Sequence, residues 1–204
     1  MTSSDPGDGP AHNTARNPDA WEFLVTRRSR PVRSLSLPVP DRGALNAILT
    51  AAARSPDHGM LVPWRFIVLQ GAAFPRLARA VQDRGESLGL DPARIDKGRR
   101  QFDEGNLAVA VIEVQRDSEK IPPIEQTRSA SAVCLSLLNA ALAAGWGANW
   151  LTGWAAHDAE FGREALGLAP NESIAGFIHI GTAESIPPER SRPDISEITR
   201  WVDK

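Results

Sequence analysis

The sequence predicts an α+β or α/β domain with about four or five strands and with helices on both faces of the sheet. Two observations predict this class. Segments with apolar residues at helical spacing alternate along the chain with short apolar runs of strand length. One of these runs, "NLAVAVIEVQ" (106–115), is apolar almost throughout, which is typical of a strand covered on both faces. The 204 residues, 42% of them hydrophobic, suffice for one sizeable core.

The first third of the chain predicts two helices and a strand. Asn17 can cap a helix that begins at Pro18, and its apolar residues fall on one face. A second helix follows "LPVPDRG", and Pro56 prevents it from continuing past Arg54 or Ser55. "WRFIVLQG" (64–71) then has the composition of a buried strand. The apolar positions of the two helices are Trp21, Leu24 and Val25, and then Leu45, Ile48, Leu49 and Ala52.

The remainder continues this alternation. Phe74, Leu77, Ala78 and Val81 predict a third helix, and a charged segment (91–105) leads to the 106–115 strand. The longest helix lies within 124–147, is small or apolar from Ala130 to Ala144, and is expected to be central, with Gly145 and Gly147 ending it. A strand and turn (148–154), a helix (158–168) with Gly167 near its end, and a last strand (173–183) follow.

Composition excludes several classes of function. A formal charge of −2 with mixed signs argues against nucleic-acid binding. The single cysteine excludes an intrachain disulfide framework, and the four scattered histidines form no recognisable metal site. Residues 1–17 are polar and contain no apolar stretch, so we expect a disordered tail before one domain (18–204), no membrane segment and a cytoplasmic protein.

Nucleotide-binding and hydrolase motifs of the G-x-G-x-x-G, P-loop and G-x-S-x-G kinds are absent. A basic stretch, "RRSRPVR" (27–33), suits a phosphate instead, because guanidinium groups bind its oxygens bidentately and the hydroxyl of Ser29 adds a donor. A solvated basic turn at a helix end explains the same residues.

The junction between the second helix and the first strand holds Arg54, Asp57, His58 and Trp64. The first three can be ordinary loop residues, and Trp64 is most simply a core aromatic. In "NWLTGW" (149–154), Gly153 would let backbone amides approach a planar ligand, and a β-bulge is the alternative. Cys134 is expected to be a small core residue, and His179, which lies between Ile178 and Ile180 in a strand, is expected to be structural.

Taken together, "TRRSRPVR", "AARSPDHGMLVPWRFIVLQ", the small-residue helix and "GWGANWLTG" resemble the nitroreductase family of flavoproteins, in the same order and over residues 18 to 190. The resemblance implies an α+β fold with a central, mainly antiparallel sheet. It also implies a homodimer with two FMN molecules at the subunit interface, each held by residues of both chains.

The resemblance also implies the site residues. Arg27, Arg28 and Ser29 would bind the FMN phosphate and ribityl end, and Arg54 and His58 would reach FMN from the partner subunit. The flavin would lie along Trp150, Leu151 and Thr152, with Gly153 allowing close approach. Near the end of the chain, Arg190 or Arg192 could add a phosphate contact, and we take Arg192 as the candidate. Arg28 and Arg54 are candidates for a positive charge near the flavin ring.

The expected activity is that of an FMN-dependent NAD(P)H oxidoreductase, which reduces nitroaromatics, quinones or related electrophiles by ping-pong hydride transfer. Because the flavin carries the chemistry, no catalytic side chain is required. Pocket residues are expected from 85–106 and from the partner, and "DHGMLVPW" departs from the Asn/Ser-rich stretch of many relatives. The alternatives are a specialised dehydrogenase or reductase on the same fold, and a flavin-binding protein or interaction domain without turnover.

Overall fold

Five strands form an antiparallel sheet whose long members are β3 (Leu107–Val114) and β5 (Glu172–Ala183). The computed structural model describes residues 16–185 and 187–203. β2 (Trp64–Gln70) pairs with β3, while β1 (Leu35–Ser36) and β4 (Gly147–Leu151) pair with β5. Every pairing between these strands is antiparallel, so the expected mainly antiparallel sheet of about four or five strands is confirmed.

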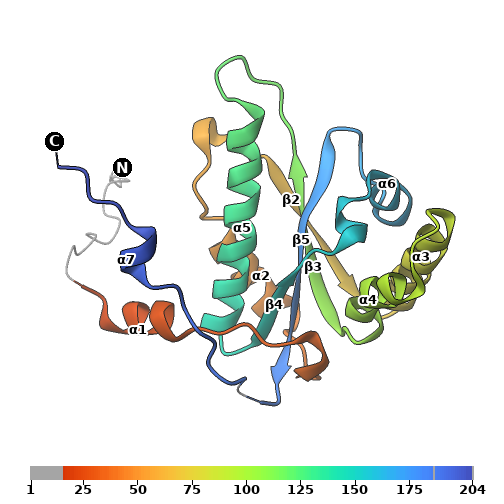
Figure 1. Ribbon diagram of the computed structural model, residues 1–204, viewed down its shortest axis with the longest axis horizontal. Coiled ribbons are helices and arrows are strands. Elements are labelled where there is room, and N and C mark those ends of the chain that lie inside the picture. Colours follow the sequence, from red (N-terminus) through yellow and green to blue (C-terminus); the bar gives the residue numbers. More distant parts are fainter. Residues whose placement is uncertain (1–15, 186, 204) are drawn as a thin grey trace, which may run out of the picture.

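Helices cover both faces of the sheet, as expected (Figure 1). α2 and α5 pack on one face, whereas α3, α4 and α6 pack on the other. Successive residues of β3 point to opposite faces: Val109 packs with the α2 and α5 cluster, and Ala110 with the α3, α4 and α6 cluster. The helices are α1 (Pro18–Thr26), α2 (Arg42–Ala52), α3 (Ala73–Ser87), α4 (Pro92–Asp103), α5 (Pro123–Ala143), α6 (Ala159–Leu166) and α7 (Ile195–Ile198).

Most elements lie where the sequence predicts them, with three differences. The charged segment 91–105 forms helix α4, and the two-residue strand β1 was not expected. Gly147 was expected to end the long helix, but it begins β4 instead. A β-carbon at Gly147 would lie 2.6 Å from Leu35 Cδ2, so this glycine permits the close packing of β4 on β1. Trp64 and Cys134 are buried, as expected, and His179 is buried as well.

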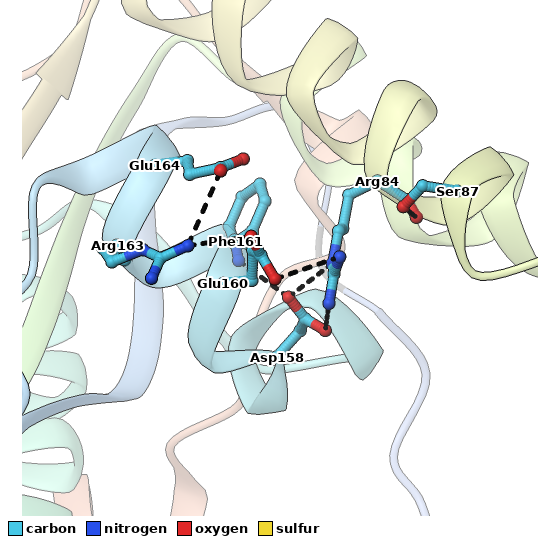
Figure 2. A network of polar contacts seen from close by, with 7 residues as sticks. All are labelled: Arg84, Ser87, Asp158, Glu160, Phe161, Arg163 and Glu164. Carbon is cyan, nitrogen blue, oxygen red and sulfur yellow. Dashed lines mark hydrogen bonds and ion pairs between the residues drawn. The ribbon is translucent and has the colours of Figure 1, made fainter.

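A network of ion pairs joins α3 to the start of α6 (Figure 2). The Arg84 guanidinium donates to both carboxylate oxygens of Asp158, at 2.9 and 3.0 Å, and lies 3.4 Å from Glu160. Asp158 also caps α6, because its Oδ1 accepts from the Phe161 amide at 2.7 Å. Hydrogen bonding from Arg84 lowers the pKa of Asp158. The network therefore fixes the segment that follows β4.

The two ends of the described chain bury little. α1 has no buried residue, and its side chains Trp21, Leu24 and Val25 are each more than half exposed. α7 also buries none, and the two helices lie at the same end of the molecule, beyond α5 (Figure 1). The predicted tail falls outside the described residues except for its last two, of which Asn17 caps α1 through the Ala20 amide. No helix among the described residues is long and apolar enough to cross a membrane.

Candidate functional site

Arg27, Arg28 and Ser29 lie in the segment that leaves α1 and turns along β4. Arg27 is the C-terminal cap of α1, with its amide donating to the Phe23 carbonyl at 2.8 Å. The Arg30 amide then donates to the carbonyl of Ala148 in β4 at 2.8 Å. This bond holds the basic segment beside the strand that carries the other predicted site residues.

Arg192, 164 positions along the chain from Arg28, lies in the same cluster. Glu189 joins them: its Oε1 lies 3.0 Å from a guanidinium nitrogen of Arg28 and 3.0 Å from one of Arg192. Burial, and then the positive charges of Arg192 and Arg28, lower the pKa of Arg27. The structure therefore brings three of the predicted arginines together, with a single carboxylate bridging two of them.

We call Arg27, Arg28 and Arg192 the arginine cluster. Within it, not every hydrogen-bond donor of the Arg27 side chain has a partner in the described chain. One of its terminal nitrogens donates to the Ser29 hydroxyl at 3.1 Å. Its Nε is buried and has no hydrogen-bond partner among the described residues. Neighbouring like charges and an unpaired buried donor both disfavour the cluster in isolation. An anion with several oxygens, such as a phosphate, would relieve both costs.

A cavity of about 800 Å³ begins where the basic segment continues past the arginine cluster, and the cluster residues themselves do not line it. The predicted residues Trp150, Leu151, Thr152 and Gly153 all line it, at the end of β4. Other walls come from Pro31, which continues the basic segment, and from the helix α4. The expectation that residues 85–106 contribute to a pocket is thus met by α4, although the sequence did not indicate which of its side chains do so.

The backbone of β4 is available to a ligand in this cavity. β4 pairs with β5 along one edge, and among the described strands none pairs with its other edge. The Ala148 carbonyl uses that other edge to bind Arg30, and strand periodicity directs the backbone groups of Trp150 to the same side. Gly153 has φ 79° and ψ 174°, a conformation that is essentially restricted to glycine. These features suit the polar edge of a flat ring.

Helix α4 approaches the cavity closely because it carries a glycine. A β-carbon at Gly98 would lie 2.4 Å from Trp154 Nε1, which donates to the Arg94 carbonyl at 3.2 Å. Gln101 is 7% exposed and reaches the residue that follows β4, with its amide nitrogen 3.4 Å from the Thr152 carbonyl. Its Oε1 is buried without a partner among the described residues. The sequence indicated the stretch 85–106 but not the α4 side chains that form this wall of the cavity.

Arg54 and His58 lie outside both groups. His58 begins a short 3-10 helix and pairs with Glu125 of α5 at 2.7 Å. Arg54 is exposed, and its side chain makes no hydrogen bond or ion pair with residues 16–185 or 187–203. Within the described part of the chain these two side chains therefore contact neither the arginine cluster nor the cavity. The structure thus divides the ten predicted residues into the arginine cluster with Ser29, the four cavity-wall residues at the end of β4, and these two.

Comparison with known proteins gives a consistent result. Residues 24–182 match the model of the family described as "Nitroreductase family". The protein named "Putative NAD(P)H nitroreductase YdjA" of Escherichia coli strain K12 is 33% identical over 166 residues, which cover 81% of this chain and 89% of that protein. A "Putative NAD(P)H nitroreductase" of Haemophilus influenzae is 30% identical over 80% of this chain and 88% of its own length.

Solved structures share the fold. A nitroreductase-like family protein from Bacillus cereus superposes with a TM-score of 0.75 at 22% identity, covering 94% of this chain and all of its own. A protein from Desulfovibrio desulfuricans, described as a "putative nitroreductase in complex with fmn", has a TM-score of 0.72 at 21% identity, over 92% of this chain and 98% of its own.

Proposed function

This chain belongs to the nitroreductase family of oxidoreductases, and from that premise we propose that it is an FMN-dependent enzyme. It takes electrons from NADH or NADPH and passes them to nitroaromatics, quinones or related electrophiles. The observation that carries the proposal is that the segment bearing the arginine cluster is hydrogen-bonded to β4, the strand whose end walls the cavity. The cytoplasmic location expected from the sequence stays a prediction.

The residues present fit FMN at both of its ends. The arginine cluster offers a phosphate dianion three guanidinium groups, including the buried Arg27 Nε that has no other partner among the described residues. The free edge of β4 and the open backbone at Gly153 offer donors and acceptors to a flat polar ring. The bond between the Arg30 amide and the Ala148 carbonyl sets these two parts side by side.

The protein has to bind and orient the reactants, since the cofactor carries the reaction. When bound, FMN supplies hydride transfer between donor and acceptor in alternating half-reactions. Arg27, Arg28, Ser29 and Arg192 anchor the phosphate. Trp150, Leu151, Thr152 and Gly153 hold the ring edge and leave the cavity side of the site for a second molecule. No acid or base of the chain is assigned to the reaction.

We also propose that the functional unit is a homodimer. The support is the exposed apolar surface of α1 and of the chain near α7, where Trp201 is 89% exposed. Such side chains are commonly buried by a partner. Arg54 and His58, which reach no part of the site within their own protomer, would then contact FMN bound to the other subunit. The domain from residue 18 to 204 is the repeating unit of this assembly.

The test is the visible spectrum of the purified protein, followed by release and identification of the chromophore. We expect flavin absorbance and about one FMN per chain, bleached anaerobically by NADH or NADPH and restored by a nitroaromatic or quinone. Bound FMN that neither nucleotide bleaches would indicate a flavin-binding protein without turnover. Protein that is colourless and takes up no added FMN would refute the proposal.

A further inference from the structure

A second group of basic side chains surrounds the mouth of the cavity, apart from the arginine cluster. Arg33 contributes from the basic segment, and Arg94, Lys97 and Arg100 contribute from α4, against one carboxylate, Glu104. Arg100 pairs with Asp96 at 2.8 Å. Arg33, Arg94 and Lys97 are exposed to solvent, and none of them forms an ion pair within the described part of the chain. The cavity mouth therefore carries an excess of positive charge.

These cations are placed by α4 rather than scattered over a surface. Arg94, Lys97 and Gln101 follow the spacing i, i+3 and i+7, which puts them on one helical face. Gln101 is 93% buried on this face and leaves its Oε1 unpartnered among the described residues. Gly98 and Trp154 fix the distance of this face from β4. This face of α4 is therefore a well-packed wall of the cavity.

The number of charges indicates the kind of ligand. FMN has one phosphate, and the arginine cluster already accounts for it in the proposed function. A single carboxylate on an acceptor would need one cation, whereas two cations, Arg94 and Lys97, lie about 4.5 Å apart along the helix at the usual rise per residue, and Arg33 adds a third from the basic segment. A ligand with several separated negative groups matches such a row. In the proposed reaction the pyridine nucleotide donor has this chemistry and must reach the same cavity.

We propose that Arg94 and Lys97 bind phosphate groups of the nicotinamide dinucleotide at the mouth of the cavity, and that they favour NADPH over NADH. The 2′-phosphate of NADPH adds negative charge that NADH lacks, so the same positive face attracts NADPH more strongly. Arg33 contributes to this attraction from the basic segment, which also lines the cavity. This inference rests on the proposed function, because it assumes that the donor enters beside FMN.

The decisive variant is Arg94→Gln combined with Lys97→Gln. Both side chains are exposed, and Trp154 binds the backbone carbonyl of Arg94, so the helix keeps its contact with the indole. Arg99→Gln is the matched control: it removes one charge from the same helix, but Arg99 contacts Gln82 and Asp103 and does not line the cavity.

Two measurements on the flavin-loaded protein test the proposal. One is the apparent Kd of NADPH and of NADH for anaerobic bleaching of the flavin. The other is the Kd of NADP⁺, which cannot reduce flavin, by titration calorimetry. In the double variant we expect both the NADPH and the NADP⁺ values to rise roughly tenfold, with a smaller rise for NADH and a smaller salt dependence. Arg99→Gln should leave all three values near those of the unmodified protein.

Other outcomes separate this inference from the proposed function. Protein that binds no FMN refutes both. Protein that binds and reduces FMN while the double variant keeps the NADP⁺ and NADPH values unchanged refutes this inference alone. The face could instead bind a negatively charged acceptor. To distinguish this, the reduced flavin is re-oxidised by 4-nitrobenzoate, which is an anion, and by 4-nitrobenzamide, which is neutral. If the double variant slows only the reaction with 4-nitrobenzoate, the face binds an anionic acceptor and the assignment to the donor is wrong.

Discussion

Glu189 lies where the proposed phosphate would lie, since its carboxylate accepts from both Arg28 and Arg192. It is exposed, and hydrogen bonds from the Arg190 amide and Arg28 lower its pKa. A phosphate and this carboxylate would compete for the same donors. The competition makes substitutions on the two sides of the ion pair act in opposite directions.

We expect Arg28→Ala to weaken FMN binding roughly tenfold, which is the usual size of one lost charge-assisted hydrogen bond. Glu189→Gln should tighten binding, because it frees the two arginines from a negative partner. The measurement is FMN affinity by flavin fluorescence after the cofactor has been removed. Arg79→Ala, an exposed arginine on α3, serves as the control. Equal affinities in all three variants would remove Arg28 from the site.

His179 offers a separate prediction about stability. Burial lowers its pKa from 6.5 to about 4, and neither ring nitrogen has a partner among the described residues. The unfolded chain binds this proton below pH 6.5 and the folded chain does not, so the free energy of unfolding should fall as the pH decreases from 6.5 to 4. His179→Leu should remove that part of the fall, about 3 kcal/mol at most. The measurement is the free energy of unfolding of both proteins in urea at several pH values between 6.5 and 4. Parallel pH dependences for the two proteins would contradict the prediction.

At the scale of elements, α4 is a helix that the sequence pattern did not predict. Its buried positions are Ile95, Gly98, Gln101 and Phe102, so a glycine and an amide occupy places where apolar residues would have revealed the helical period. The helices with apolar residues at those places, such as α2, were predicted close to their observed positions. Sequence patterns therefore recovered the longer strands and most helices, but neither α4 nor the side chains that it contributes to the cavity wall.

The same reasoning applies to the candidate site. Segments that are continuous in sequence, 27–29 and 150–153, could be identified because each carries a local pattern. Arg192 was a candidate only by resemblance, since no local pattern near it points to a distant loop. Arg94 and Lys97 belong to a charged helix, and only the packing of Gly98 on Trp154 shows which of its charges face the cavity.

Gly98→Ala should disturb the packing of α4 against Trp154 in the cavity wall. The added methyl group would overlap the Trp154 indole, and such overpacking costs about 1–3 kcal/mol. Gly43→Ala, in the first turn of α2, meets only Asp41 Oδ1 at 3.4 Å and should stabilise the protein by about 0.5–1 kcal/mol. Thermal unfolding compares the two, and tryptophan fluorescence should change only for Gly98→Ala. A stabilised Gly98→Ala variant would show that the helix does not depend on this contact.

At the scale of the whole molecule, the proposed dimer predicts that a charge on α1 disrupts association. Leu24 is 58% exposed on a helix that buries nothing within the protomer, so Leu24→Arg should be harmless to the fold. We expect the unmodified protein to have twice the chain mass of 22.1 kDa in light scattering, and Leu24→Arg to be largely monomeric.

Leu88→Arg is the control for this experiment. Leu88 is 43% exposed and caps α3, at the opposite end of the molecule from α1 (Figure 1). It should leave the mass unchanged. Bound FMN should decrease in parallel with dimer content in Leu24→Arg if Arg54 and His58 act across the interface. A monomeric unmodified protein that retains FMN would contradict the proposed assembly.

The isolation of α1 has a consequence for how the protein matures. A helix of nine residues with no buried side chain is shorter than the roughly 12–15 residues at which helices become marginally stable in water. Its last turn leads directly into Arg27 and Ser29, so the phosphate anchor is ordered only as well as that turn is. In the proposed dimer a newly synthesised chain would complete its core first, acquire an ordered anchor on meeting a second chain, and load FMN last. Bound FMN would then stabilise the dimer. Dilution that separates the two chains would release the cofactor.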